Sequence, residues 1–104
     1  MDLQLKNKTA LVAGASRGLG YATALALARE GCRVVVNGRD ADKVKAAAER
    51  IGRETGASAF GLAGDVSQAD VPAQLVAQTV KALGGLDLLV TNSSGPTPGT
   101  LEAL

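Results

Sequence analysis

The stretch Ala10–Glu30, which reads ALVAGASRGLGYATALALARE, decides the fold of this chain. A short apolar run ends at Gly14, a loop with two more glycines follows, and a long apolar segment continues to Glu30. This order is typical of a strand, a tight loop and a helix. We therefore expect a strand over 8–13 and a helix over 18–30, which Gly31 would end. Because the helix is apolar on most sides, we expect it to be well buried.

The three glycines of the loop each have a physical use. Gly14 lets the chain turn off the strand, Gly18 lets the backbone approach a phosphate, and Gly20 lets the helix pack closely on the strand. The free N–H groups in the first turn of the helix favour an anion at the same place. The spacing lacks the Gly-Lys-Ser/Thr ending of the Walker phosphate loop. The pattern predicts a bound pyrophosphate, hence a dinucleotide; the alternative is a close-packed structural turn.

Strand and helix patterns alternate along the rest of the chain. A β-branched run over 33–37 predicts a second strand, and weaker or shorter apolar runs predict strands over 57–63 and 86–92. Short crossovers between such strands favour parallel pairing with right-handed connections. We expect an α/β fold with the sheet order 3-2-1-4, and a ligand at the carboxyl ends of strands one and four, where the order reverses.

Start and stop signals frame the two later helices. Asp40 predicts the start of one helix and Gly56 its end, while the segment 67–70 resembles a capping box and Gly84 ends the other helix. The residues expected to face the core are Val44, Ala47, Ala48 and Ile51 in the first of these helices, and Val71, Leu75, Val76, Val80 and Leu83 in the second. The residues expected on a solvated face are Lys43, Lys45, Glu49, Arg50 and Arg53.

The loop 13–20 resembles the cofactor loop of the short-chain dehydrogenase/reductase family, with Ala13 where that family usually has Thr. The resemblance implies a Rossmann-type fold and an oxidoreductase that transfers hydride between a nicotinamide cofactor and a small carbonyl or alcohol substrate. It also implies that the loop residues hold the cofactor, namely Gly14, Ser16, Arg17, Gly18, Leu19 and Gly20.

The end of the second strand bears on the choice between NAD and NADP. A carboxylate there would bind the ribose hydroxyls of NAD, whereas a cation would bind the 2′-phosphate of NADP. Gly38 stands where the acid is expected, Arg39 follows it, and Arg17 and Ser16 supply a second cation and a hydroxyl. We therefore predict NADP rather than NAD. The alternative is that both arginines are ordinary solvated side chains.

Two further segments match the family's cofactor contacts. Asp65 and Val66 follow the third strand, where the resemblance implies a bond from the Asp to the adenine amino group and help from the next residue's backbone. Asn92 ends the predicted fourth strand and matches the second Asn of the family's Asn-Asn-Ala-Gly segment, with Thr91 in place of the first. Purely structural roles remain open for Asp65, as a turn aspartate, and for Asn92, in bonding backbone groups between strands.

The family's catalytic Tyr and Lys, four residues apart, have no counterpart here. The only tyrosine is Tyr21, Leu25 stands four residues later, and the chain has no His. No catalytic residue and no metal ligand is therefore assigned. Because the family's chains are longer, we expect residues 1–104 to form the N-terminal, cofactor-binding portion of a Rossmann-type domain, with the catalytic residues in sequence beyond it.

The amino-acid composition indicates the kind of protein and the partners to expect. Apolar residues make up 46% and charged residues 20% of the 104 residues, as in soluble globular proteins. The net charge of +1 offers no argument for nucleic-acid or membrane binding. The single Cys32 opens an apolar strand, so we expect a buried thiol. No signal-peptide pattern precedes Lys8, and we expect a cytoplasmic protein that forms a homo-oligomer at full length.

Two other functions are alternatives to an oxidoreductase. One is a dinucleotide-binding module without catalysis, which would act as a sensor or bind a partner chain. The other is a methyltransferase, which would need a ribose-binding acid after the second strand that is absent here. We also expect the chain alone to melt at low temperature or to associate, because the fourth strand leaves a bare sheet edge.

Overall fold

The computed structural model describes residues 5–15 and 18–91 of the chain. Strands and helices alternate along these residues, as the sequence predicts. The elements are β1 (Thr9–Ala13), α1 (Gly18–Arg29), β2 (Arg33–Gly38), α2 (Ala41–Thr55), β3 (Ala59–Ala63), α3 (Val71–Leu83) and β4 (Leu88–Thr91).

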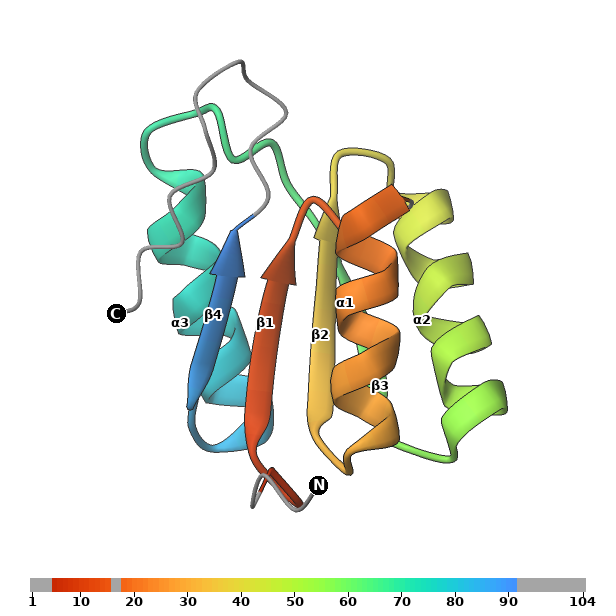
Figure 1. Ribbon diagram of the computed structural model, residues 1–104. Helices are drawn as coiled ribbons and strands as arrows, with labels where there is room; N and C mark the ends of the chain where they lie inside the picture. Colours follow the sequence, from red (N-terminus) through yellow and green to blue (C-terminus); the bar gives the residue numbers. More distant parts are fainter. Residues whose placement is uncertain (1–4, 16–17, 92–104) are drawn as a thin grey trace.

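The strands form one parallel sheet in the order β3-β2-β1-β4 (Figure 1). Leu11 at the centre of β1 pairs with Val35 of β2 and Leu89 of β4, which sets the register. The expected α/β class and strand order are thus confirmed. β3 begins at Ala59, later than predicted, because the N–H of Ala57 donates to the Thr55 hydroxyl at the end of α2.

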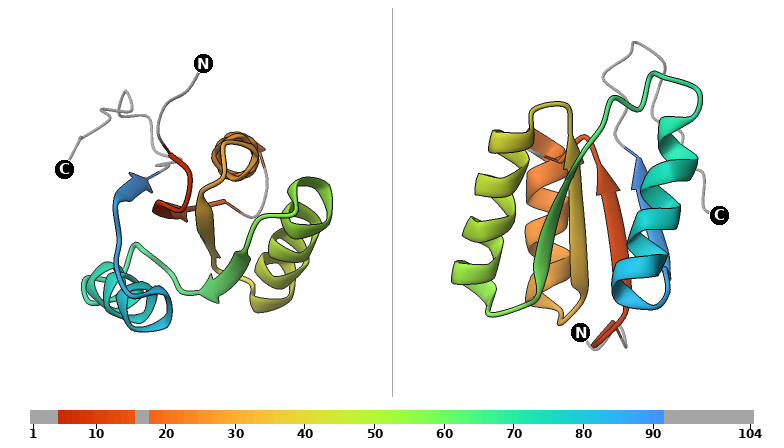
Figure 2. Two further views of the ribbon diagram at one scale, coloured as in Figure 1. Left: turned by 90° about the horizontal axis from the view of Figure 1, so that it is seen from below. Right: turned by 180° about the vertical axis from the view of Figure 1, so that it is seen from behind.

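Helices cover both faces of the sheet, α1 and α2 on one and α3 on the other (Figure 2). Alternate residues of β1 divide between the two layers, because side chains alternate along a strand. Val12 packs with α1 and α2, whereas Leu11 packs with Leu75 of α3. The helix that follows β1 and the helix that precedes β4 lie on different faces of the sheet. This arrangement leaves room for a ligand at the carboxyl ends of the two strands.

Full burial in helix α1 is confined to one stripe, so the expectation that the helix is well buried holds only for part of it. The stripe consists of Gly20, Ala24 and Ala28, spaced four residues apart. Small residues at this spacing bring one face of the helix close to its neighbours, and Tyr21, Leu25 and Leu27 beside the stripe are only partly buried against the same core. Leu19 is 75% exposed. Gly31, with φ +94°, follows the helix in the left-handed backbone expected of a stop.

Helix α2 follows its sequence signals closely. Asp40 caps the N-terminus, and its Oδ1 accepts hydrogen bonds from the N–H groups of Asp42 and Lys43 at 2.9 and 3.2 Å. Gly56 ends the helix in the left-handed backbone. The buried residues are those predicted: Val44, Ala47, Ala48 and Ile51.

Helix α3 corrects two expectations. The predicted capping box is absent, because the helix begins at Val71 with Pro72 in its first turn, and Asp70 makes no side-chain capping bond. Val80 is 41% exposed, whereas Thr79 is buried and donates its hydroxyl to the Leu75 carbonyl at 2.8 Å. Residues four apart share a helix face, so Thr79 follows Leu75 inward and Val80 turns outward.

The single cysteine is buried, as predicted. Its thiol donates a 3.5 Å hydrogen bond to the Leu5 carbonyl. Burial raises the pKa of the Cys32 thiol, and the nearby carboxylates of Asp87 and Glu30 raise it further. Cys32 therefore acts as a small core residue at the start of β2.

Candidate functional site

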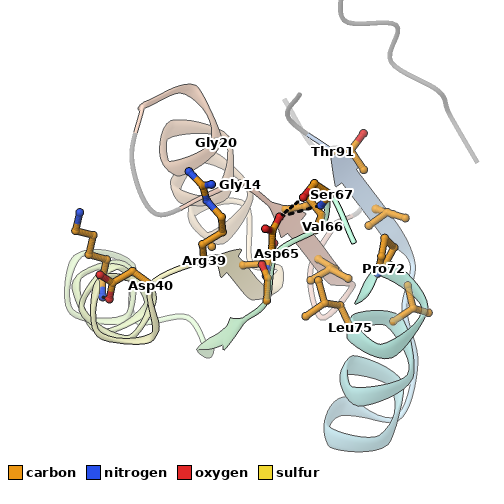
Figure 3. Close-up of a pocket in the computed structure, with 18 of the residues that line it drawn as sticks. Gly14, Gly20, Arg39, Asp40, Asp65, Val66, Ser67, Pro72, Leu75 and Thr91 are labelled. Atoms are coloured by element: carbon orange, nitrogen blue, oxygen red, sulfur yellow. Dashed lines mark hydrogen bonds between the residues drawn. The ribbon is translucent and has the colours of Figure 1, made fainter. Parts of the chain in front are cut away.

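A groove of about 960 Å³ lies at the carboxyl ends of the parallel strands (Figure 3). This volume is in the upper part of the range of about 300–1,000 Å³ typical of small-molecule sites. The groove combines glycine backbone from the first loop, polar side chains after β2 and β3, and apolar side chains from α3 and β4. The described residues that line it are Leu11, Ala13, Gly14, Gly18, Leu19, Gly20, Asn37, Gly38, Arg39, Asp40, Lys43, Gly64, Asp65, Val66, Ser67, Pro72, Leu75, Val76, Leu89 and Thr91.

The glycine loop forms one wall of the groove. Gly14 and Gly18 have φ values of +69° and +68°, in the region that side chains disfavour. A Cβ atom added to Gly18 would meet no atom of residues 5–15 or 18–91 within 4 Å, so this part of the chain leaves the space above its backbone open. The N–H of Ala15 donates to the Asn37 carbonyl at 2.7 Å and ties the loop to β2. The backbone is therefore accessible to a ligand at Gly18.

Two predicted contacts are exposed apolar side chains that line the groove. Leu19, at the start of α1, is 75% exposed, and Val66, after β3, is 40% exposed. Exposed branched side chains that line a groove offer apolar contact to a flat ring system. Three other predicted residues, Ser16, Arg17 and Asn92, lie outside the described residues.

Arg39 brings a positive charge to the groove directly after β2. Figure 3 shows its side chain directed toward the wall formed by Gly14 and Gly20. Gly38 precedes it, so no carboxylate stands at the position expected to bind ribose hydroxyls. Arg39 is also close enough to Asp65 that its charge contributes to lowering the pKa of that carboxyl. The ends of β2 and β3 thus lie close together and both contribute to the groove.

The Asp65 carboxylate is oriented by Ser67. Its Oδ1 accepts a 2.7 Å bond from the Ser67 hydroxyl and a 3.0 Å bond from the Ser67 N–H (Figure 3). Both bonds lower the pKa of Asp65, and the bond from the Ser67 hydroxyl has the larger effect. The carboxyl group is therefore ionised at neutral pH. This is the arrangement of a turn aspartate, and Oδ2 takes no part in either bond.

Asn37 has a positioning role that the sequence reasoning missed. This buried side chain donates from Nδ2 to the carbonyls of Leu62 and Gly64 at 2.9 and 3.1 Å. The N–H of Gly64 donates in turn to the Gly38 carbonyl at 2.9 Å. These bonds hold the loop that carries Asp65 against the end of β2. The available signal was a polar residue at the end of an otherwise apolar strand.

The only tyrosine of the chain lies apart from the groove. The Tyr21 ring is covered by the Arg50 guanidinium, 5.4 Å from the ring centroid, and its hydroxyl is buried without a hydrogen-bond partner among the described residues. It is not among the residues that line the groove. Across residues 5–15 and 18–91, no cluster of His, Cys, Asp or Glu has the arrangement of a metal site. No helix in that part of the chain is long and apolar enough to cross a membrane.

Solved structures closely resemble this arrangement. The L-sorbose reductase of Gluconobacter frateurii, crystallised with NADPH and L-sorbose, superposes with a TM-score of 0.87 at 30% identity. The match covers 100% of this chain and 40% of the reductase. A metagenomic short-chain oxidoreductase in complex with NADP superposes with a TM-score of 0.80 at 37% identity, over 88% of this chain and 41% of that one.

Proteins with similar sequences are dehydrogenases and reductases as well. The glucose 1-dehydrogenase of Gluconobacter oxydans is 44% identical over 95 residues, which are 91% of this chain and 36% of that enzyme. The chain thus spans well under half the length of these relatives. The family model described as short chain dehydrogenase matches residues 8–104. With its parallel sheet and glycine loop, the chain belongs to the short-chain dehydrogenase family.

Proposed function

We propose that this chain is the cofactor-binding part of an NADP-dependent short-chain oxidoreductase that acts on a small carbonyl or alcohol. The observation that carries the proposal is the pairing of open glycine backbone at Gly18 with a cation, Arg39, at the end of β2. NADPH in the sorbose reductase and NADP in the metagenomic oxidoreductase support the same cofactor for this chain.

The groove fits a dinucleotide on three counts. Gly18 leaves room for a phosphate beside the N-terminus of α1, where the helix dipole favours an anion. Arg39 offers the guanidinium that a 2′-phosphate requires. Asp65, held by Ser67, presents an ionised acceptor after β3. These features support roles for Gly18 at the pyrophosphate, Arg39 at the 2′-phosphate and Asp65 at the adenine amino group.

The remaining predicted residues complete this assignment. Gly14 and Gly20 shape the loop, while Leu19 and Val66 contact the cofactor through apolar surface or backbone. Ser16, Arg17 and Asn92 belong to the same proposed set on their sequence positions. The cofactor, when bound, supplies the hydride acceptor or donor at its nicotinamide ring. The residues of this chain bind and orient it.

A dinucleotide-binding module without catalysis is a second candidate. Tyr21 packs under Arg50 and lies outside the groove, so neither candidate assigns it a role at the cofactor. The mass of the polypeptide from its native source separates the two candidates. A mass far above 10.4 kDa supports the oxidoreductase and directs the search to Tyr and Lys four residues apart in the additional sequence. A mass of 10.4 kDa supports the module.

Cofactor preference is tested by titrating NADPH and NADH into the wild-type protein at its natural length and into an Arg39→Asp variant. We expect NADPH to bind more tightly to the wild type, and the variant to lose roughly tenfold or more in NADPH affinity, because a charge-assisted bond becomes a repulsion. Arg53→Asp, on the last turn of α2 and outside the groove, is the matched control. Equal affinities of the wild type for both cofactors would remove the proposed preference.

The phosphate-binding role of the loop is tested with Gly18→Val and the control Gly84→Val. Both glycines have positive φ, +68° and +83°, and neither has an atom within 4 Å of an added Cβ. The two variants therefore carry similar backbone strain, but only Gly18 lines the groove. We expect Gly18→Val to abolish binding of both cofactors and Gly84→Val to retain it. Retained binding by Gly18→Val would make the loop purely structural.

A further inference from the structure

Lys43 is exposed, as its place in the sequence predicts, and it lines the same groove as Arg39. It stands in the first turn of α2, four residues after Arg39. The Asp40 cap fixes this turn, because Oδ1 of Asp40 accepts bonds from the N–H groups of Asp42 and Lys43. The backbone that carries Lys43 is therefore held in a defined position relative to the end of β2.

The positive charges in this part of the groove are more available to a ligand than the negative charges are. Oδ1 of Asp40 is bonded to the N–H groups of α2, and its charge is further offset by the dipole of that helix. Oδ1 of Asp65 is bonded to Ser67. Arg39 and Lys43 are both exposed side chains on the groove. Two cations are thus presented where two carboxylates are partly satisfied by protein donors.

A phosphate monoester needs more than one such cation. It carries a charge of about −1.5 to −2 at pH 7, so a single guanidinium leaves part of the charge unmatched. An ammonium group on a flexible stem provides a second point charge without the planar geometry that a guanidinium demands. Lys43 is the described cation that lines the groove together with Arg39.

We propose that Lys43 is a further specificity-determining contact for the 2′-phosphate of NADP, acting together with Arg39. This inference rests on the proposed use of NADP and extends it to a residue one helical turn further along the chain. Asp40, although acidic and in the same groove, serves as the helix cap rather than as a receptor for ribose hydroxyls.

The test uses two fragments of the cofactor, adenosine 2′,5′-bisphosphate and adenosine 5′-monophosphate, titrated by calorimetry into the protein at its natural length. These probes differ only by the 2′-phosphate and require no catalysis. We expect Lys43→Gln to weaken the bisphosphate roughly tenfold, as loss of a charge-assisted contact does, and to change the monophosphate less than about twofold. Lys43→Arg keeps the charge and should retain most of the bisphosphate affinity.

Lys45→Gln is the matched control, because Lys45 is exposed on the same helix and does not line the groove. If Lys43→Gln weakens the bisphosphate no more than Lys45→Gln does, while the wild type still prefers the bisphosphate, the role of Lys43 is refuted and NADP use stands. If the wild type binds both probes equally, the NADP proposal itself fails, and the inference fails with it. Far-UV circular dichroism of each variant verifies that α2 is intact.

Discussion

At the scale of single residues, the groove depends on side chains that orient other side chains. Ser67 holds one carboxylate oxygen of Asp65 with its hydroxyl and its N–H, at 2.7 and 3.0 Å. Asn37 holds the loop on which Asp65 stands through two carbonyl groups. Neither residue needs to touch a ligand to matter, because each determines where the Asp65 carboxylate lies.

Replacing Ser67 by Ala should raise the pKa of Asp65 toward its ordinary value. The hydroxyl bond is the largest cause of the lowered pKa, and the remaining N–H bond keeps part of the effect. A folded-state pKa below the unfolded value stabilises the fold above the unfolded pKa, and this contribution is lost as the pH falls through the folded pKa. The variant should therefore lose less stability on acidification than the wild type does.

The measurement is a titration of the Asp65 carboxyl carbon by NMR, in the wild type and in the variant. Ser58→Ala, an exposed serine outside the groove, is the control and should leave the Asp65 midpoint unchanged. A midpoint for Ser67→Ala equal to that of the wild type would show that the hydroxyl has no part in orienting or stabilising the carboxylate.

At the scale of elements, close contact between β3 and α2 requires a residue without a side chain. A Cβ atom added to Gly61 would lie 2.6 Å from Cγ1 of Val44 and 2.9 Å from its carbonyl oxygen. Gly61 weakens the strand propensity of β3, yet it allows the strand to lie against the buried face of α2. The glycine that makes this strand hard to recognise is thus the one that lets it pack.

We expect Gly61→Ala to destabilise the fold by about 1–3 kcal/mol, since a methyl group there overpacks a contact with backbone atoms that cannot move freely. Gly52→Ala is the matched substitution within α2, where the nearest atom to an added Cβ is 3.7 Å away. That change should stabilise the helix by about 0.5–1 kcal/mol, because Ala favours helical backbone more than Gly does. Urea unfolding of both variants measures the two effects, and equal shifts would contradict the packing argument.

At the scale of the whole molecule, the two faces of the sheet are unequally covered. Among the described residues, α1 and α2 close one face, whereas α3 alone packs on the other (Figure 2). β3 and β4 form the two edges of the sheet, and Phe60 on β3 is 47% exposed. An apolar face with open strand edges favours association with other chains.

We therefore expect the 104-residue chain, expressed by itself, to self-associate. Its weight-average mass by sedimentation should exceed 10.4 kDa and rise with concentration, and its apparent melting temperature should change over the same range. Phe60→Lys should reduce the association, because a charge on an edge strand opposes edge pairing. A monodisperse species of 10.4 kDa with a sharp, concentration-independent melt would contradict the expectation.

The sequence by itself determined the elements, their order and the place of the groove. The run 10–30, the Asp40 cap and the glycine stops are local features, and local backbone preferences are sufficient to produce them. Right-handed crossovers between parallel strands allow only a few strand orders, and the order β3-β2-β1-β4 is the one observed. The groove residues Gly18, Arg39 and Asp65 could be predicted for the same reason, since Gly18 begins α1, Arg39 directly follows β2, and Asp65 stands two residues after the end of β3.

Only the tertiary structure decided which side chains of these elements meet. Lys43 is exposed, as predicted, but it also lines the groove, because the start of α2 lies beside the end of β2. The Asn37 side chain forms hydrogen bonds with the carbonyl groups of Leu62 and Gly64 at the end of β3. In α3, Thr79 and not Val80 is buried. These outcomes depend on the placement of one element against another, to within a few ångströms. The pattern of residues along the chain does not specify the distances between side chains of different elements, whereas the packing of the helices on the sheet does.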